Sequence, residues 1–189
     1  QVRLVECASP TQVLRLFENG TVDVAATTLA EALALAQHGI DLRVFLVTDT
    51  SVGADAIVAR EGLPDLAALK GHRVGVESSL AGDYLLTRAC QKSGLDRAAL
   101  KIVSLGIDEQ ERAFLAGRVD AVVTRDPALS RLLGQGTRQV FSSKDLPDEI
   151  VGVLVIRRER LDELGPALRL VVKGWFKALS HMEAQPAAA

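Results

Sequence analysis

The sequence has few of the residues that usually build catalytic or metal centres. Its 189 residues include 2 cysteines and 3 histidines. Cys7 and Cys90 lie far apart, outside any CxxC pair and without a histidine at metal-ligand spacing, which favours two buried small side chains. The histidines have no acidic or thiol partner at a useful spacing. The sequence therefore predicts neither a catalytic residue nor a metal site.

Long apolar runs and an excess of positive charge are also missing. No run approaches the roughly 18 apolar residues that a membrane-spanning helix needs. The 22 Lys and Arg residues are scattered and the net charge is −2, so a nucleic-acid-binding surface is not supported. Gly134-Gln135-Gly136 follows a helical pattern and lacks the third glycine of a dinucleotide fingerprint. Without a phosphate loop or a nucleophile elbow either, no cofactor is predicted.

What remains is the composition of an ordinary globular protein, 48% hydrophobic and 24% charged. The length suits one large domain or two small lobes. Strand-like and helical patterns alternate along the chain, beginning with an expected strand at residues 2–7. The run Ala121-Val122-Val123 is typical of a strand buried on both faces. This alternation predicts an α/β fold with mainly parallel sheets.

An internal repeat links residues 17–27 with residues 114–124. Five of the eleven positions match, in the order Phe, Gly, Val, Asp and Thr. We expect the Phe to anchor a last helical turn, the Gly to end the helix and the Asp to cap amides of the tight turn. Each copy ends in a Thr at the end of a strand, where α/β sheets place ligands. The alternative, that any helix-to-strand joint looks like this, stays open.

Several segments together resemble one protein family. They are NGTVDVA at 19–25, DTSVGADAI at 49–57, LKGHRVGVE at 69–77, GRVDAVVT at 117–124 and the apolar strand at 150–156. In order and spacing they are similar to the NMT1-like substrate-binding proteins of nitrate/sulfonate/taurine-type ABC importers. The resemblance implies a type II periplasmic-binding fold, with two α/β lobes, ligand in the cleft and crossing strands near 55–60 and 151–157.

The resemblance also implies lobe boundaries. Lobe 1 is expected to be discontinuous, over residues 1–58 and 152–189, and lobe 2 continuous, over residues 59–151. Family members carry a further strand and helix before the segment that begins here at Gln1, so lobe 1 is expected to lack its opening strand and helix. We expect a mature, trimmed or partial chain, or a homodimer in which a partner chain fills the gap. A periplasmic location and an ABC permease partner are implied by the resemblance, since no signal-peptide pattern stands at the start.

Two hydroxyl pairs follow predicted strands and are candidate solute-binding residues. Ser78 and Ser79 open a helix, where hydroxyls and unpaired amides suit an anion, and Gly82 leaves room for close approach. Thr27 and Thr28 stand at the matching position of the first copy. Simple helix N-caps explain both pairs as well.

Three charged residues and one more hydroxyl complete the candidate site. Asp49 and Ser51 follow the strand expected at 42–47, where a carboxylate could bind an amine or act only within a turn. Arg125 could clamp a carboxylate, sulfonate or phosphate, or could be a solvated side chain. Asp126, before Pro127, is either a ligand contact or a helix cap.

The predicted function is non-catalytic binding of a small anionic or zwitterionic organic solute by closure of two lobes. The solute classes that the resemblance implies are a sulfonate, nitrate, taurine or a pyrimidine. One alternative is the effector-sensing domain of a transcription regulator or sensor kinase. Another is a small enzyme on the same scaffold, a thiamine-pyrimidine synthase or a menaquinone-pathway lyase, although the Cys- and His-rich motif of the synthases is missing.

Overall fold

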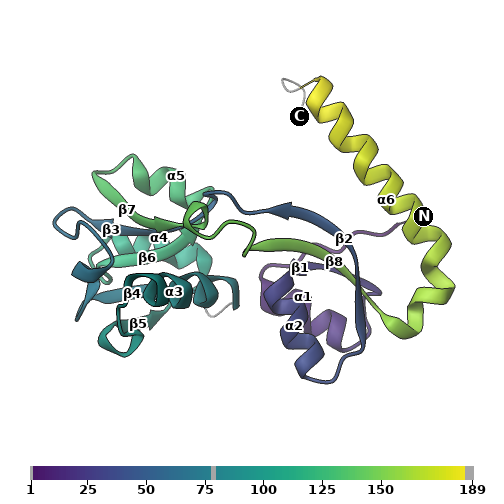
Figure 1. Ribbon diagram of the computed structural model, residues 1–189, viewed down its shortest axis with the longest axis horizontal. Helices are drawn as coiled ribbons and strands as arrows, with labels where there is room; N and C mark the ends of the chain where they lie inside the picture. Colours follow the sequence, from purple (N-terminus) through teal and green to yellow (C-terminus); the bar gives the residue numbers. More distant parts are fainter. Residues whose placement is uncertain (1, 78–79, 186–189) are drawn as a thin grey trace. The chain divides into compact units, whose positions relative to one another are not determined.

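The computed structural model describes residues 2–77 and 80–185. The chain divides into two compact units (Figure 1). Unit 1 takes its described residues from 1–27, 32–47 and 153–189, and unit 2 takes them from 28–31 and 48–152. The chain passes between the units within two strands, β2 (Leu42–Thr50) and β8 (Val151–Arg157), and also on either side of the short stretch of residues 28–31, which belongs to unit 2.

Unit 1 contains a three-stranded sheet in the order β1-β8-β2. Its elements besides β2 and β8 are α1 (Pro10–Glu18), β1 (Val24–Thr28), α2 (Leu29–Gln37) and α6 (Arg158–Ala184). Helix α1 begins where the sequence predicts, because the Ser9 side chain accepts a hydrogen bond from the Gln12 amide and Pro10 takes the first helical position.

The prediction of a strand at residues 2–7 is wrong. These residues are in neither a helix nor a strand, and Val2, Leu4 and Val5 are exposed. An apolar run becomes a strand only where a neighbouring strand supplies its hydrogen bonds and covers its side chains. Local pattern alone does not provide that neighbour.

Unit 2 contains a five-stranded sheet in the order β5-β4-β6-β3-β7. Its strands are β3 (Asp55–Arg60), β4 (Arg73–Val76), β5 (Lys101–Ser104), β6 (Ala121–Arg125) and β7 (Thr137–Ser142). Its helices are α3 (Leu80–Ser93), α4 (Ile107–Leu115) and α5 (Ala128–Leu133), with 3₁₀ turns at Ala67–Leu69, Arg97–Ala99 and Ser143–Asp145. Strand β4 runs parallel to β5 and β6, whereas β3 runs antiparallel to β6 and β7, so the sheet is mixed rather than mainly parallel.

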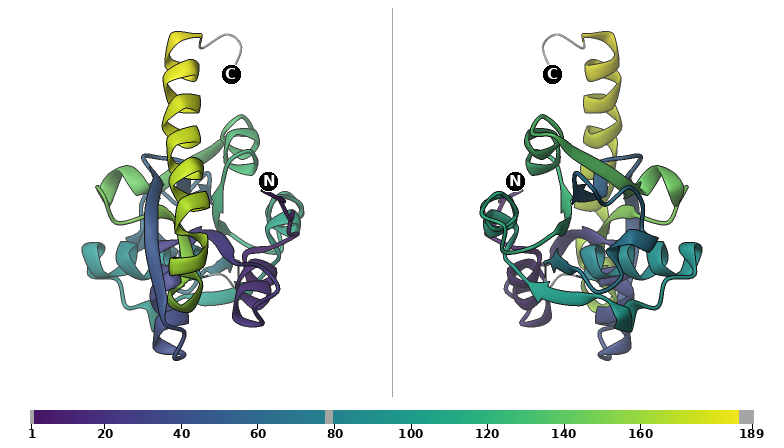
Figure 2. Two further views of the ribbon diagram at one scale, coloured as in Figure 1. Left: turned by 90° about the vertical axis from the view of Figure 1, so that its right-hand side faces the viewer. Right: turned by 90° about the vertical axis from the view of Figure 1, so that its left-hand side faces the viewer.

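Strands β3 and β6 are buried on both faces of this sheet. On one face, Ile57 and Val123 pack in a cluster that includes residues of α3. On the other face, Val58 and Val122 pack against residues of α4 and α5. The ribbons of these elements are drawn in Figure 1 and, from two other sides, in Figure 2. The double burial predicted for Ala121-Val122-Val123 is therefore confirmed. Strand β3, whose residues were expected to cross between lobes, lies wholly in unit 2.

The internal repeat forms the same turn twice. Phe17 and Phe114 are both buried, and the glycines that end the two helices have φ values of 70° at Gly20 and 74° at Gly117. The Thr21 amide donates to the Leu16 carbonyl, and the Arg118 amide donates to the Ala113 carbonyl, both at 2.9 Å. A positive φ favours glycine, which explains why this residue is shared by both copies.

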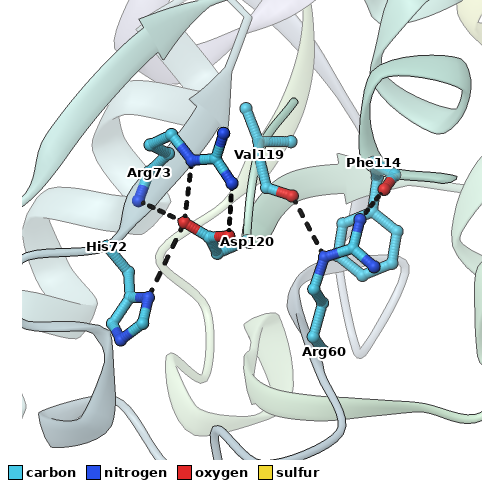
Figure 3. A network of polar contacts seen from close by, with 6 residues as sticks. All are labelled: Arg60, His72, Arg73, Phe114, Val119 and Asp120. Carbon is cyan, nitrogen blue, oxygen red and sulfur yellow. Dashed lines mark hydrogen bonds and ion pairs between the residues drawn. The ribbon is translucent and has the colours of Figure 1, made fainter. Parts of the chain in front are cut away.

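An arginine completes each copy, and the sequence analysis missed both of them. The guanidinium of Arg60 lies over the Phe114 ring, 4.7 Å from its centre, and donates to the Phe114 carbonyl (Figure 3). Arg157 lies over the Phe17 ring in the same way, at 5.3 Å, and donates to the Phe17 carbonyl. Since Arg60 ends β3 and Arg157 ends β8, the repeat extends to the strand that supports each helix end.

The repeated aspartates also bind arginines, rather than the amides of their own turn as expected. Asp120 accepts hydrogen bonds from Arg73 through the backbone amide, Nε and Nη2, at 2.9, 3.0 and 2.7 Å, and His72 Nδ1 lies 3.6 Å away (Figure 3). Asp23 accepts one bond, from Arg160 Nε at 3.0 Å. The contacts of Asp120 join the amino-terminal ends of β4 and β6.

Candidate functional site

The candidate residues of unit 2 gather at one edge of its sheet. Strands β4 and β6 are parallel and end at this edge, and the antiparallel β3 begins there. Glu77 follows β4, Arg125 ends β6, and Asp55 stands opposite Arg125 in the register of β3 and β6. Ligands of α/β sheets bind beyond the carboxyl ends of the parallel strands, so this edge is the candidate site.

The guanidinium of Arg125 makes no hydrogen bond among the described residues. Its Nη2 lies 3.7 Å from Glu77 Oε2, which is an ion pair too long for a hydrogen bond. The Arg125 side chain is 37% exposed, whereas that of Glu77 is 13% exposed. Within the part of the chain that the structure describes, neither side chain has another polar partner. The guanidinium therefore keeps its hydrogen-bond donors for a further group.

Asp126 acts within its own segment. Its Oδ1 accepts hydrogen bonds from the Ser130 amide at 3.1 Å and from the Ser130 hydroxyl at 2.5 Å. Its amide donates to the Ala54 carbonyl at 3.3 Å. These bonds give the carboxylate a structural role at the start of α5, although Pro127 rather than Asp126 takes the N-cap position that the sequence predicted for Asp126.

Ser51 ties the connection between β2 and β3 to the end of β7. Its hydroxyl lies 2.5 Å from Asp55 Oδ2 and 2.9 Å from the Ser143 hydroxyl, which also accepts a hydrogen bond from the Gly53 amide at 2.6 Å. Ser143 is buried. Ser51 thus lies beside the edge, with its hydroxyl already engaged by protein groups.

Asp49 lies near the end of β2, against β8. Its Oδ2 accepts a hydrogen bond from the Thr48 hydroxyl at 2.9 Å. A side chain at Gly152 would overlap the Asp49 carboxylate and the Thr48 hydroxyl, so a larger residue there would displace these two side chains. Among the described residues, no hydrogen bond or ion pair joins Asp49 to Arg125.

The hydroxyl pair of the first copy is divided between two roles. Thr28 and Glu31 form reciprocal bonds: the Thr28 amide and hydroxyl each donate to Glu31 Oε2 at 2.8 Å, and the Glu31 amide lies 3.3 Å from the Thr28 hydroxyl. This is the capping box of α2, as the N-cap alternative predicted. Thr27 is half-buried near the end of β1.

The remaining candidates belong to the start of α3. Ser78 and Ser79 lie outside the described residues. Gly82 is half-buried in the first turn of α3. The predicted anion-binding role of this helix start stays a prediction.

Two polar residues of unit 2, Glu77 and Gln110, were not singled out from the sequence, whereas Thr124 was expected at a strand end that faces ligand. Glu77 could have been found by the rule that singled out Arg125, since it also follows a buried strand. Thr124 is 3% exposed and Gln110 is fully buried, yet in the described structure no hydrogen bond reaches the Thr124 hydroxyl or either end of the Gln110 amide. Gln110 stands three and four residues before the buried Ala113 and Phe114, so helical spacing places it on the same face. A buried polar group without a partner costs about 1–3 kcal/mol, which makes both residues candidates for contact with a further polar group.

Two features are absent from the described residues, a metal-binding cluster and a membrane-spanning helix. They contain no group of three or more His, Cys, Asp and Glu side chains that could hold a metal ion. Among them, none of the helices has the length and apolar character that crossing a membrane requires.

Comparisons with known proteins give one family and relatives that are named as binding proteins. The family model described as NMT1/THI5 like matches residues 1–189. A protein of Escherichia coli (strain K12) named as an aliphatic sulfonates-binding protein is 29% identical over 143 residues, which are 75% of this chain and 45% of that protein. A protein of Brucella abortus (strain 2308) named as a binding protein is 30% identical over 117 residues, or 57% of this chain and 36% of that protein. The chain thus spans less than half the length of these curated relatives.

Two solved structures are similar over nearly the whole chain. The alkanesulfonate-binding protein SsuA from Xanthomonas axonopodis pv. citri, bound to MOPS, has a TM-score of 0.86 and 26% identity. The periplasmic aliphatic sulphonate binding protein SsuA from Escherichia coli has a TM-score of 0.84 and 24% identity. Each match covers 97% of this chain and 64% of the other protein.

Proposed function

The chain belongs to the NMT1/THI5-like family and has the fold of the type II periplasmic-binding proteins, and from this premise we propose that it binds a small organic solute for an ABC importer. The activity is non-enzymatic binding, the location is the periplasm, and the partner is the permease complex. Because the chain spans only part of the length of its relatives, the solute, the location and the permease partner are all proposals.

The solute class that we propose is an organic sulfonate. The Escherichia coli relative is named for aliphatic sulfonates, and the Xanthomonas structure is named for alkanesulfonates and holds MOPS. In this chain the observation that carries the proposal is the free donor capacity of Arg125 at the carboxyl edge of the unit 2 sheet. A guanidinium presents donors in a fork that matches two oxygens of a carboxylate, phosphate or sulfonate.

The other predicted contacts remain part of the proposal. Ser78 and Ser79 would add hydroxyls and helix amides to the oxyanion site, with Gly82 allowing close approach. The solute contact predicted for Thr27 stays a prediction. The predicted lobes, residues 1–58 with 152–189 and residues 59–151, and the completion of lobe 1 by a second copy stay predictions.

The two alternatives are not favoured. The two relatives and two solved structures described above are named as binding proteins, and none of these names describes an enzyme or a regulator. Turnover of a pyrimidine or menaquinone precursor that is lost in Arg125→Ala, with the fold intact, would overturn the non-enzymatic proposal.

Isothermal titration calorimetry against alkanesulfonates, nitrate, pyrimidines and aromatic carboxylates tests the proposal. We expect sulfonate binding, and we expect Arg125→Ala to weaken it about 10- to 100-fold, the size of one or two lost charge-assisted hydrogen bonds. Arg118→Ala is the matched control, because Arg118 is exposed beyond the opposite end of β6. Failure of the wild-type protein to bind any sulfonate would reject the proposed solute class.

A further inference from the structure

The candidate edge carries more negative charge than a site for a simple anion needs. Asp55, Glu77 and Asp126 place three carboxylates around the ends of β4 and β6 and the start of β3. The cations nearby are Arg125 and Lys144, and the Lys144 stem lies against Gly53. A plain anion would therefore approach a region whose charges sum to less than zero.

Glu77 differs from the other two carboxylates in its partners. Asp55 accepts a hydrogen bond from the Ser51 hydroxyl, and Asp126 accepts two from Ser130. In the described structure Glu77 has one polar partner, Arg125, at 3.7 Å, and no hydrogen bond. Its side chain is only 13% exposed. A largely buried carboxylate without hydrogen bonds is costly, so Glu77 has acceptor oxygens that favour a further donor.

The position of Glu77 decides what kind of donor fits. Its carboxylate lies within 4 Å of the guanidinium that the proposed function assigns to the solute's oxyanion. A sulfonate that binds Arg125 alone would come close to Glu77 and be repelled by it. A solute with an ammonium group a few bonds from its sulfonate would give both members of the pair a charged partner.

We propose that Glu77 is a specificity-determining residue, which restricts the site to solutes that carry an amine as well as an oxyanion. The proposal rests on the proposed function and narrows its solute class. Glu77 accepts the hydrogen bonds of the ammonium group, while Arg125 donates to the oxyanion. A zwitterion neutralises the charges of both Glu77 and Arg125, whereas a simple sulfonate neutralises only that of Arg125.

A purely structural role for Glu77 predicts a different change in the solute affinities when Glu77 is removed. If Glu77 only orients Arg125, its removal weakens every oxyanion ligand by the same factor. If Glu77 selects for an amine, its removal changes the affinities of two matched solutes in opposite directions. The pair of solutes therefore separates selection from positioning.

The experiment is calorimetry of the purified protein with 2-aminoethanesulfonate and ethanesulfonate, which share a two-carbon chain. We expect the wild-type protein to bind the amine-bearing solute at least about tenfold more tightly, the least that a charge-assisted hydrogen bond implies. We expect Glu77→Gln to abolish this preference by weakening 2-aminoethanesulfonate and strengthening ethanesulfonate. Glu61→Gln, which removes an exposed carboxylate beyond the opposite end of β3, should leave both affinities unchanged.

The outcomes separate this inference from the proposed function. Tight wild-type binding of ethanesulfonate without a preference for the amine would overturn the role of Glu77 and leave sulfonate binding intact. Equal weakening of both solutes by Glu77→Gln would also overturn it. Failure of the wild-type protein to bind any sulfonate would reject the proposed solute class itself. The comparison of the two solutes on the wild-type protein needs no variant, so it tests the proposal even if Glu77→Gln does not fold.

Discussion

The two copies of the internal repeat share a turn but hold their aspartates to different degrees. Both copies have a buried Phe, a glycine with positive φ and an arginine stacked over the Phe ring. Asp120 is 17% exposed and accepts three hydrogen bonds from Arg73. Asp23 is 53% exposed and accepts one from Arg160. The same local sequence gives the same turn, whereas the neighbouring element, β4 for Asp120 and α6 for Asp23, decides how many hydrogen bonds the aspartate accepts.

Removal of the buried rings should have the largest effect in both copies. Phe114→Ala and Phe17→Ala should each lower the free energy of unfolding by about 3–5 kcal/mol, because both rings are fully enclosed. Hydrogen–deuterium exchange, followed peptide by peptide, should show the loss of protection first in unit 2 for Phe114→Ala and first in unit 1 for Phe17→Ala. Equal loss in both units for either variant would contradict the description of two compact units.

Substitution of the aspartates should have different effects on stability in the two copies. We expect Asp120→Asn to cost about 2 kcal/mol of unfolding free energy, since it leaves the bonds of Arg73 poorly matched, and Asp23→Asn to cost less than about 0.5 kcal/mol. Urea denaturation at neutral pH measures both. Equal costs would mean that the extra bonds of Asp120 add no stability.

Acid should remove the difference in the free energy of unfolding between the wild-type protein and Asp120→Asn. The hydrogen bond and charge of Arg73 hold the pKa of Asp120 well below its ordinary value. A carboxyl with a lowered pKa stabilises the fold above the unfolded pKa of about 4 and loses this contribution as the pH falls through its folded value. The Arg88 hydrogen bond likewise lowers the pKa of Glu149 to about 2, and that contribution is common to both proteins. Denaturation between about pH 7 and pH 2 should therefore show the gap closing at the acid end.

The stacked arginines should have a smaller effect, of similar size in both copies. Arg60→Ala and Arg157→Ala should each cost about 1.5 kcal/mol, through loss of the ring contact and of hydrogen bonds to the helix-ending carbonyls. Thermal unfolding measures the loss. Lysine at either position should recover only part of it, because an ammonium does not stack as a planar guanidinium does.

Substitution of the glycines should have the smallest effect on the free energy of unfolding, and the two copies should give nearly the same value. Gly20→Ala and Gly117→Ala should each cost about 1 kcal/mol, because both positions hold a positive φ and no contact closer than 3.8 Å awaits a side chain. Urea denaturation compares them. A clearly larger cost at one glycine would show that the two turns are not equivalent.

Much of the candidate site follows from strand order, which local sequence does not specify. The rule that ligands gather beyond strand ends singled out Arg125 and Ser51, but it did not identify which neighbours face them. Glu77 and Arg125 are separated by 48 positions in the sequence and become partners only because β4 and β6 are adjacent in the sheet. Asp126 and Thr28, in contrast, form their hydrogen bonds within four residues, so their structural alternative was visible in the sequence.

The sequence by itself determined the features whose causes are local. These are the start of α1 at Ser9-Pro10, the two glycine-ended helices of the repeat, and the ordered motifs that indicate the family. Tertiary structure alone decided that residues 2–7 form no strand, that β3 runs antiparallel, and that Asp120 is held more firmly than Asp23. The physical reason is that helix caps and turns are satisfied by nearby residues, whereas strand pairing, burial and charge pairing depend on groups that only folding brings together.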